Sequence, residues 1–433
     1  YPENPEAGID LFLEKLVQET EKEHEDILEQ ADETDAVFGE LYSWYLRNPE
    51  YRSRVQKLVQ SAFAGKPKDI ISQSVAKALY GEVSPYSATR LERFAACAFA
   101  HFLQYGMKLT ERVEYEFKPM DMGNVMHEAL ESFAEEVRKR GMKWTELTEQ
   151  ERNEIADRCL DNIVADYGNT VLKSSARNEY MIERTRRILR RTVWALQKQL
   201  EQGEFQPEGF EVTFGGGRID RVDIMEDQNK VYVKVIDYKT GNTSFGLVYL
   251  YHGLQLQLMI YLDGALRVEQ KKYPDKEIIP AGVFYYNIKD PMIQEKIDAD
   301  VEAVSAGLMK ELKMNGLVQA DPELVYRMDS SLGSIPVAFN KDGSFRKNSS
   351  VADRTQFAVL GRYVRTKIEK IRSSILEGDA EVSPYELGKK NACTYCPYMT
   401  VCGFDRRLSG YEFRRLKNFS DEELWKAFDR EAE

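Results

Sequence analysis

Apolar residues recur at helical spacing along several stretches of this chain. Between residues 8 and 80, short apolar stripes predict consecutive helices. One stripe begins at Leu11 and continues with Phe12, Leu16 and Val17, and another begins with Leu41, Trp44 and Tyr45. Longer stripes with three- and four-residue spacing predict amphipathic helices over 123–137, 180–199, 255–268 and 357–375. Ser87 has the position of an N-cap ahead of a further helix that carries Leu91, Phe94, Cys97 and Phe99.

The pattern changes to strand character between residues 210 and 287. Residues 231–237 alternate between apolar and polar side chains, and residues 282–287 are β-branched or aromatic, so both segments are predicted strands. The helical stretch 255–268 separates them. The order of strand, strand, helix and strand indicates a mixed α/β core. Farther on, residues 340–343 (Asn-Lys-Asp-Gly) are typical of a hairpin turn.

The composition is that of an ordinary globular protein with two or three units. The chain has 433 residues, of which 42% are hydrophobic and 30% are charged. A net charge of −12 argues against a protein that coats nucleic acid through its overall charge, although a local basic channel remains compatible with it. No apolar run approaches membrane-spanning length, so no membrane partner is expected. The first residue is Tyr1, and we expect the sequence to be a piece of a longer protein.

The predicted helix over 180–199 is rich in cations. Two interpretations of its cationic side are equally weighted: a surface that follows a phosphate backbone, or an exposed face balanced by the many carboxylates of the chain. The cations are Arg184, Arg186, Arg187, Arg190, Arg191 and Lys198.

Acidic residues end two predicted strands in a way that suggests a cation site. On the strand from Val231, alternate residues share one face, which is apolar until its last two members, Asp237 and Lys239. Asp220 comes from a neighbouring short strand, residues 218–224, on which Asp223 points to the opposite side. Two such carboxylates suffice to hold Mg²⁺ or Mn²⁺, with water and phosphate oxygens completing the coordination.

Each of these residues also has a simpler interpretation. An isolated Asp-x-Lys is commonly a surface ion pair, but Asp220, seventeen positions before Asp237, fits a hairpin that returns to the same edge. His127, on the helix that we expect to begin at Gly123, adds a nitrogen ligand or orients a water in one interpretation. In the other it is a packed helix histidine.

Four of the five cysteines suggest a second metal site. Cys393, Cys396 and Cys402 lie within ten positions of one another, and Cys97 is the candidate fourth ligand. A buried small residue is the simpler interpretation of Cys97 taken alone, and Cys159 is assigned to packing. Thiolates in this arrangement bind Zn²⁺ or an iron–sulfur cluster, and the spacing does not distinguish the two. Such a site and the low cysteine content favour a reducing cytoplasmic location over a secreted disulfide scaffold.

Four successive motifs resemble those of the RecB-type nuclease family within the PD-(D/E)XK fold. They are residues 123–127 (Gly-Asn-Val-Met-His), 217–220 (Gly-Arg-Ile-Asp), 237–239 (Asp-Tyr-Lys) and 257–261 (Gln-Leu-Met-Ile-Tyr). The resemblance implies an α/β nuclease core with a mixed β-sheet flanked by helices. It also implies a metal surrounded by His127, Asp220, Asp237 and the Tyr238 carbonyl, with Lys239 positioning or activating water. Gln257 and Tyr261 would contact the DNA strand.

Residues 87–106, together with the C-terminal cysteines, resemble the iron-staple nucleases, and most closely those of AddAB-type helicase-nucleases. The resemblance covers about residues 46–404. It implies a structural [4Fe-4S] cluster, without redox turnover, on Cys97, Cys393, Cys396 and Cys402. It further implies that residues 1–83 are the helical end of a helicase-like region and residues 84–433 are the nuclease domain.

The chain departs from this family pattern in two places. Ala98 follows Cys97 where the family usually has a proline, which leaves the thiol intact. The segment 214–218 (Phe-Gly-Gly-Gly-Arg) is abrupt, because relatives usually carry a further strand and loop there. We therefore expect either a missing loop or a shortened sheet just before Asp220, and we favour the missing loop.

The expected function is a metal-dependent exonuclease that acts on single-stranded DNA, preferentially the 5′-terminated strand. By resemblance it belongs to a helicase-nuclease for double-strand-break repair by recombination, with AddA as its partner. Residues 64–67 (Ala-Gly-Lys-Pro) do not make a phosphate-binding loop, so no ATP hydrolysis is expected here. Two alternatives remain: a catalytically silent, cluster-stabilised DNA-binding module, and a cluster-based redox or radical enzyme. A fourth ligand at Cys97 argues against the second alternative, because it would leave no iron open.

Overall fold

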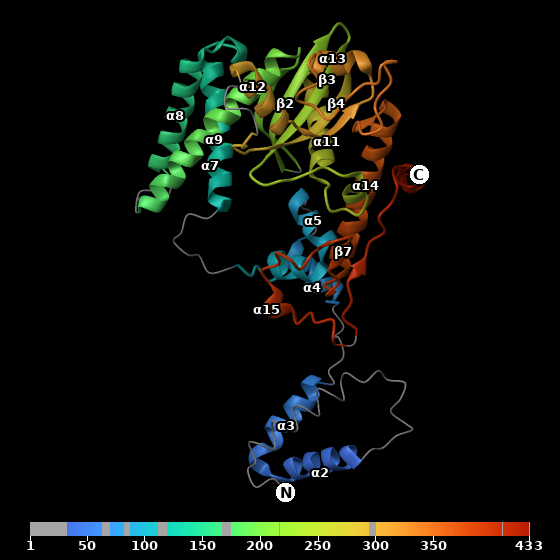
Figure 1. Cartoon of the computed structure of the whole chain (residues 1–433). Helices are drawn as coiled ribbons and strands as arrows, with labels where there is room; N and C mark the ends of the chain where they lie inside the picture. The colour runs from blue at the N-terminus through green and yellow to red at the C-terminus, as the bar shows by residue number, and fades with distance from the viewer. Residues whose placement is uncertain are drawn as a thin grey trace.

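A six-stranded mixed sheet lies between two layers of helices in the computed structural model (Figure 1). The structure describes residues 33–62, 70–81, 87–110, 119–166, 175–215, 217–293, 300–408 and 410–432. The strands follow one another across the sheet in chain order: β1 (Gln206–Phe214), β2 (Gly217–Asp227), β3 (Lys230–Lys239), β4 (Glu277–Asn287), β5 (Asn315–Gln319) and β6 (Val351–Ala352). The pairs β3/β4 and β5/β6 are parallel and the others antiparallel. The predicted mixed α/β fold is confirmed.

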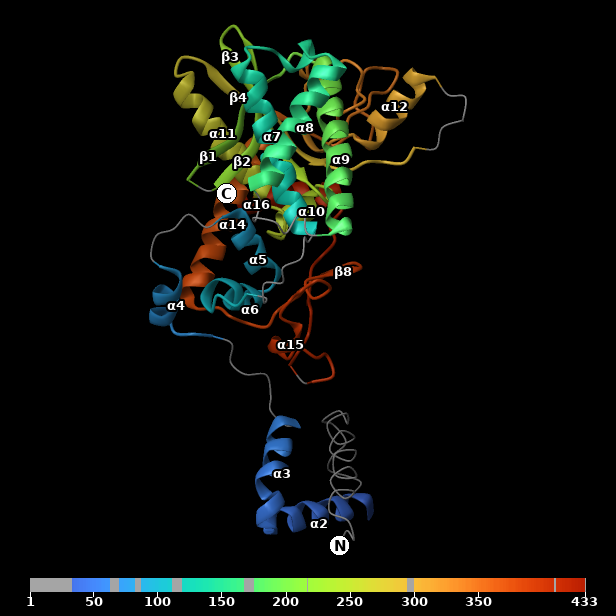
Figure 2. The same ribbon diagram turned by 90° about the vertical axis from the view of Figure 1, so that its left-hand side faces the viewer.

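Each face of the sheet is covered by its own set of helices and has its own core. One face packs against α7 (Pro119–Lys139), α8 (Glu149–Asp166) and α9 (Ala176–Glu201) through residues such as Phe133, Tyr232 and Ile236. The opposite face packs against α5 (Ala88–Ala96), α11 (Gln257–Lys272), α14 (Arg354–Glu377) and α16 (Asp421–Ala432). Figure 2 shows α7, α8 and α9 side by side in front of the sheet. The apolar face of β3, made by Val231, Val233 and Val235, belongs to the second core, as predicted.

The connections between strands decide where the chemistry lies. A tight antiparallel turn joins β2 to β3, so the start of β2 and the end of β3 meet at one edge of the sheet. The parallel pairing of β3 with β4 requires a crossover, which α11 supplies after the short helix α10 (Leu247–Tyr251). The N-terminus of α11 therefore lies at the same edge as the end of β3.

Smaller elements complete the description. They are α4 (Gln73–Tyr80), α6 (Ala98–His101), the π-helix Phe102–Gly106, the 3₁₀ turn Trp144–Glu146, α12 (Val301–Glu311), α13 (Pro322–Met328), α15 (Met399–Cys402), β7 (Tyr385–Leu387), β8 (Lys390–Asn391) and β9 (Arg414–Arg415). The last three strands form a separate small sheet next to the C-terminal cysteines. The turn over 340–343 is confirmed, since the Asn340 amide donates to the Ser344 carbonyl across 2.8 Å.

The N-terminal helices divide into two groups. The helices α2 (Glu33–Arg47) and α3 (Pro49–Ala62) pack on each other around Tyr45 and Val55. By contrast, Ala76 and Tyr80 of α4 belong to the core on the α14 side of the sheet. The expected boundary at residues 83–84, the apolar stripe from Leu11 and the segment 64–67 lie outside the described residues, so the division into 1–83 and 84–433 stays a prediction.

Two predicted helix boundaries are wrong. The helix with His127 begins at Pro119, not at Gly123, and Met126, Leu130 and Phe133 form its buried side. Ser87 is the N-cap of α5, but the helix ends at Ala96. Cys97 therefore does not lie on the helix: its backbone is extended, with φ −165° and ψ 117°, between α5 and α6.

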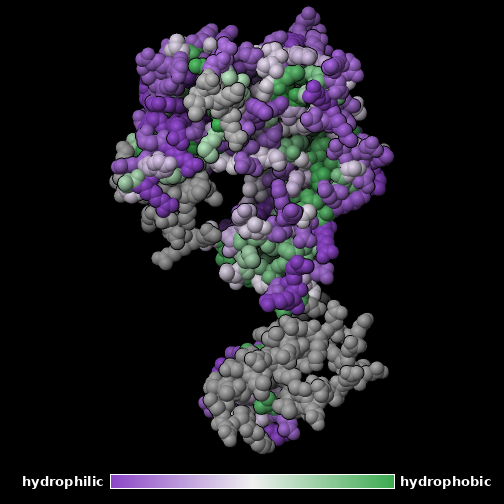
Figure 3. All heavy atoms as spheres, in the orientation of Figure 1, coloured by the Kyte–Doolittle hydropathy of each residue, from purple (hydrophilic) through white to green (hydrophobic). Residues whose placement is uncertain are grey.

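The arginines of α9 are engaged by carboxylates. Arg186 lies 2.7 Å from Asp161, and Arg190 Nε donates to Asp157 across 2.8 Å. Both partners belong to α8. Arg187 reaches Asp290 at 2.6 Å. The structure thus supports the interpretation of an exposed, carboxylate-balanced helix, and this part of the surface is predominantly hydrophilic (Figure 3).

Among the described helices, none combines the length and the apolar composition that a membrane crossing requires.

The close approach of β4 and β5 gives a test of this register. A Cβ at Gly316 would overlap the Val283 carbonyl oxygen and lie 2.8 Å from the Phe284 Cα. We expect Gly316→Ala to lower the free energy of unfolding by about 3 kcal/mol, because the two strands must separate. Chemical denaturation measures this. Gly215→Ala is the control, since no atom lies within 4 Å of its Cβ position; equal stability of the two variants would contradict the register.

Candidate active site

Three carboxylates form a row across β1, β2 and β3. The pairing of Phe210 with Arg221, and of Arg221 with Ile236, brings their neighbours Glu211, Asp220 and Asp237 next to one another. Residues opposite each other on adjacent strands project from the same face of a sheet. The two predicted strand-end acids therefore meet at one edge, as expected. Glu211 extends the pair to three.

His127 of α7 faces this row. Its Nδ1 atom lies 3.3 Å from Asp220 Oδ2 and 3.9 Å from Glu211 Oε1. Among the described residues, His127, Glu211 and Asp220 form the group whose ligand atoms all lie within 4.8 Å of one another. One imidazole nitrogen and carboxylate oxygens are a ligand set suited to a divalent cation such as Mn²⁺ or Mg²⁺. The interpretation of His127 as a purely packed residue is not supported, because its ring reaches the acids.

Asp237 and Lys239 are held in place by different partners. The Lys239 ammonium lies 2.6 Å from Asp237 Oδ2, and Asp237 is almost completely buried. The backbone amide of Tyr238 donates a hydrogen bond of 2.7 Å to Asp220 Oδ2. The backbone at the end of β3 thus fixes the position of Asp220, while the Asp237 carboxylate on the same strand is paired with Lys239.

The crowding of carboxylates changes their acidity. Burial, followed by the charge of Asp220, raises the pKa of Asp237 to about 7, and the same two causes raise the pKa of Glu211 to about 7. Burial disfavours the charged form of His127, but the hydrogen bond to Asp220 and the surrounding acidic charges outweigh it, so the pKa of His127 is raised. The carboxylates of this site outweigh the positive charge of the nearby side chains, and a divalent cation would supply the missing positive charge.

A chain of hydrogen bonds links Lys239 to the start of α11. The Lys239 ammonium donates to Gln257 Oε1 across 2.8 Å, and the amide nitrogen of Gln257 donates to the Tyr261 hydroxyl across 2.9 Å. Gln257 and Tyr261 are one helical turn apart and lie beside the acids. The structure therefore brings the predicted DNA-contacting residues together with Lys239, while their contact with DNA stays a prediction.

Sequence reasoning missed Glu92, which holds α11 in position. One carboxylate oxygen of Glu92 accepts hydrogen bonds from the amides of Leu256, at 2.7 Å, and Gln257, at 2.9 Å. These amides belong to the unpaired first turn of α11. Burial raises the pKa of Glu92 to about 7. The contact spans more than 160 positions, and no local signal in the sequence could reveal it.

Sequence reasoning also missed Glu211. It stands between Phe210 and Val212 in an alternating strand, which is the pattern of an outward polar side chain on a half-exposed sheet. In the structure Glu211 has φ 49°, a left-handed conformation that is rare for residues other than glycine. Its side chain is buried and forms an ion pair with Arg218. Strained backbone of this kind is often found at functional sites.

The connection before Asp220 is short in the structure. Phe214 at the end of β1 pairs with Gly217 at the start of β2, so the two strands form a direct hairpin. The alternative of a shortened sheet edge thus describes this chain as it stands. The Phe214 ring packs edge-on against Tyr261 with 5.9 Å between centroids.

The four candidate cluster cysteines lie near one another, since the thiols of Cys97, Cys396 and Cys402 influence that of Cys393. The helix α15, which ends at Cys402, lies below the sheet in Figures 1 and 2. Cys97 and Cys396 share a small hydrophobic cluster with Leu103 and Tyr398. Burial, together with the neighbouring thiols of Cys97, Cys396 and Cys402, raises the pKa of Cys393 to about 11. None of these cysteines is in a disulfide. Cys159 is buried in the α8 core, as predicted.

Comparison with known proteins agrees with this geometry. The family model of the PD-(D/E)XK nuclease superfamily matches residues 85–403. The chain belongs to this superfamily. The expected fold class, an α/β nuclease core with a mixed sheet flanked by helices, is thereby confirmed.

Curated relatives extend the similarity into the helical N-terminal part. The chain is 41% identical to the B-type subunit of the ATP-dependent helicase/deoxyribonuclease of Lachnoclostridium phytofermentans, with 93% of this chain and 36% of the relative covered. Proteins of the same name from Thermoanaerobacter sp. and Alkaliphilus metalliredigens are each 34% identical, over 93% and 92% of this chain and 37% of the relative. The chain thus spans slightly more than a third of their length. The expected resemblance to B-type subunits of helicase-nucleases is confirmed.

Substitutions of Glu92 test how α11 is held. Glu92→Leu leaves two buried amides without an acceptor, and we expect it to lower the free energy of unfolding by about 2–4 kcal/mol. Glu92→Gln keeps a carbonyl oxygen of the same reach and should cost less than about 1 kcal/mol. Denaturant unfolding compares the two. Equal losses in both variants would show that the acceptor oxygen does not hold the helix.

Proposed function

We propose that this chain is a metal-dependent deoxyribonuclease that hydrolyses phosphodiester bonds of single-stranded DNA. The observation that carries the proposal is the convergence of His127, Asp220, Asp237 and Lys239 at one edge of a PD-(D/E)XK sheet. The relatives are named as B-type subunits of a helicase/deoxyribonuclease, which supports DNA as the substrate.

The metal site of this proposal consists of His127, Asp220 and Asp237, together with Glu211 and the Tyr238 carbonyl. The residues fit a divalent cation, because three buried or half-buried carboxylates face one another with too little positive charge to balance them. When bound, Mg²⁺ or Mn²⁺ polarises the scissile phosphate and makes a water more acidic. Asp220 and His127 hold ligand atoms toward the same point, which limits where the ion sits.

Lys239 has the electrostatic role in this site. Its ammonium lies between Asp237 and Gln257, so it is fixed next to the scissile phosphate and stabilises negative charge as water attacks. Gln257 orients the lysine, and Tyr261 continues the hydrogen-bonded line toward the DNA strand. Each of these side chains comes from a strand or a helix, which gives the site a rigid frame.

A [4Fe-4S] cluster on Cys97, Cys393, Cys396 and Cys402 is part of the proposal. Two observations support it: the thiols of Cys97, Cys396 and Cys402 lie near that of Cys393, and none of the four is in a disulfide. The Phe404 amide points at Cys402 Sγ from 3.5 Å, a contact typical of cluster sulfurs.

The biological setting is proposed from the relatives and the family resemblance. We place the chain in a helicase-nuclease for double-strand-break repair by recombination, in the cytoplasm, with AddA as its partner. Degradation from the end of the 5′-terminated strand follows from the same resemblance. The alternative is a catalytically silent, cluster-stabilised DNA-binding module, which the intact set of Asp220, Asp237 and Lys239 disfavours.

Replacement of Asp237 separates the nuclease from the silent module. We expect Asp237→Ala to lower the Mg²⁺-dependent cleavage of single-stranded DNA by about a thousandfold or more, because a metal ligand and the partner of Lys239 are both lost. Cleavage of an end-labelled oligonucleotide measures this. Asp275→Ala, a change of an exposed acid at the opposite end of the strands from Asp237, is the control and should retain cleavage. A protein that never cleaves, with or without Asp237, is the result expected of a silent module.

Iron content tests the cysteine site. Protein purified without oxygen should be coloured and contain about four iron atoms per chain. Cys402→Ser should lose most of this iron, whereas Cys159→Ala should keep it, because Cys159 lies in the α8 core. Colourless protein with one zinc ion would refute the cluster. Full nuclease activity in a folded Cys97→Ser protein would argue against its stapling role.

A further inference from the structure

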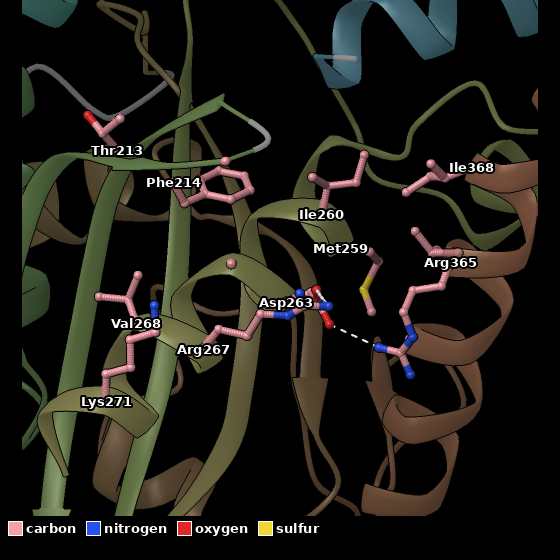
Figure 4. Close-up of a pocket in the computed structure, with 14 residues that line it drawn as sticks. Thr213, Phe214, Met259, Ile260, Asp263, Arg267, Val268, Lys271, Arg365 and Ile368 are labelled. Carbon is pink, nitrogen blue, oxygen red and sulfur yellow. Dashed lines mark hydrogen bonds and ion pairs between the residues drawn. The ribbon is translucent and has the colours of Figure 1, made fainter. Parts of the chain in front are cut away.

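A groove runs between α11 and α14, beside the end of β1. It holds a cavity of about 390 Å³, within the size range of small-molecule pockets. Half-buried Phe214 and Ile368, with buried Met259 and Ile260, form an apolar floor, and Arg267, Lys271 and Arg365 form a cationic rim (Figure 4). We call this set the α11–α14 groove. A shallower depression of about 880 Å³ continues it past Arg365 to Lys370.

The groove is continuous with the active site through a line of contacts. Lys239 binds Gln257, Gln257 binds the Tyr261 hydroxyl, and the Tyr261 ring packs against Phe214 at the entrance of the groove. Met259 and Ile260 lie on the same helix as Gln257 and Tyr261. This line of contacts therefore runs from the catalytic acids to Phe214, which lines the groove.

Asp263 orients the two arginines of the rim. It lies 2.8 Å from Arg267 Nη2 and 2.9 Å from Arg365 Nη1, and the row of these side chains crosses the pocket in Figure 4. Each guanidinium has five N–H donors, so most remain available to another acceptor. Both arginines are largely exposed, and Lys271 adds a further positive charge. The chain has a net charge of −12, so this local excess of cations favours binding of an anionic ligand here over the rest of the surface.

The aromatic floor complements the cationic rim. Gly264 lets the Phe214 ring lie directly on α11, because a Cβ there would come within 2.6 Å of the ring. A ring held in this way offers a flat, sequence-independent surface to a base. Stacking platforms beside cations that follow a backbone are the usual means of binding single strands.

We infer that the α11–α14 groove binds the portion of single-stranded DNA that extends beyond the cleaved bond, with bases on the Phe214 floor and phosphates on Arg267, Lys271 and Arg365. The inference rests on the proposed nuclease function and adds to it a defined strand path. It makes these residues determinants of the substrate length that the enzyme holds.

Binding without cleavage tests the strand path. In the intact protein with EDTA, we compare fluorescence anisotropy of single-stranded oligonucleotides of increasing length for wild type and for Arg267→Gln/Lys271→Gln/Arg365→Gln. Wild-type affinity should rise once the oligonucleotide reaches the groove, and the triple variant should lose this gain. Each phosphate contact contributes about 0.7 to the slope of log K against log salt for single strands, so the slope should fall by about 2. Phe214→Leu should weaken the binding of long oligonucleotides about five-fold or more, without changing the slope of log K against log salt.

A matched control removes the same number of charges elsewhere. Lys139→Gln/Lys341→Gln/Lys426→Gln should bind as wild type does. Equal DNA affinity of the two triple variants would refute the proposed strand path. An equal loss of affinity for short and long oligonucleotides in the groove variant would also refute it. Loss of binding to the AddA partner with unchanged DNA affinity would instead make the groove a protein interface and refute the proposal. Mg²⁺-dependent cleavage of the shortest substrate should persist in the groove variant, whereas its absence in wild type would refute the nuclease function itself.

Discussion

The mutual repulsion of acids in a buried row is the constraint around which this structure is organised. Glu211, Asp220 and Asp237 occupy neighbouring positions on three adjacent strands, where the strand pairing leaves them no room to separate. Burial and mutual charge raise the pKa of Glu211 and of Asp237 to about 7. His127, Lys239 and Arg218 offset part of this charge. A cation bound at this edge of the sheet would neutralise the crowded carboxylates, which would then serve as its ligands.

The rest of the fold keeps this edge rigid. On the face toward α7, buried Asp223 accepts from Arg221 at 2.6 Å and lies 3.0 Å from Lys234, so the charged residues behind Asp220 are paired with one another. On the other face, Glu92 fixes the start of α11 and thereby the partner of Lys239. Contacts on both faces of the sheet thus fix the positions of the few residues at the end of β3. Removal of a single partner would leave a buried charge uncompensated.

Much of this could be predicted from the sequence, because the informative signals were local. The alternation that ends in Asp237 and Lys239, together with the motif at Asp220, predicted the correct strands and the correct meeting point. Helix boundaries were less predictable: α7 begins four residues before Gly123, and α5 stops one residue before Cys97. Glu211 and Glu92 escaped prediction for a physical reason. An acid on an alternating strand resembles a solvent-facing residue, and a carboxylate that caps a helix more than 160 positions away leaves no trace in its own neighbourhood.

The nine-residue helix α5 connects the start of α11 with the region of the C-terminal cysteines. Glu92 near its middle binds the first turn of α11, and Cys97 follows immediately after its end. The proposed cluster would anchor the C-terminal end of this helix, while Glu92 at its middle positions Gln257, the partner of Lys239. Loss of the cluster through iron starvation or oxidation would then displace Lys239, and the proposed nuclease activity would be lost before the sheet unfolds.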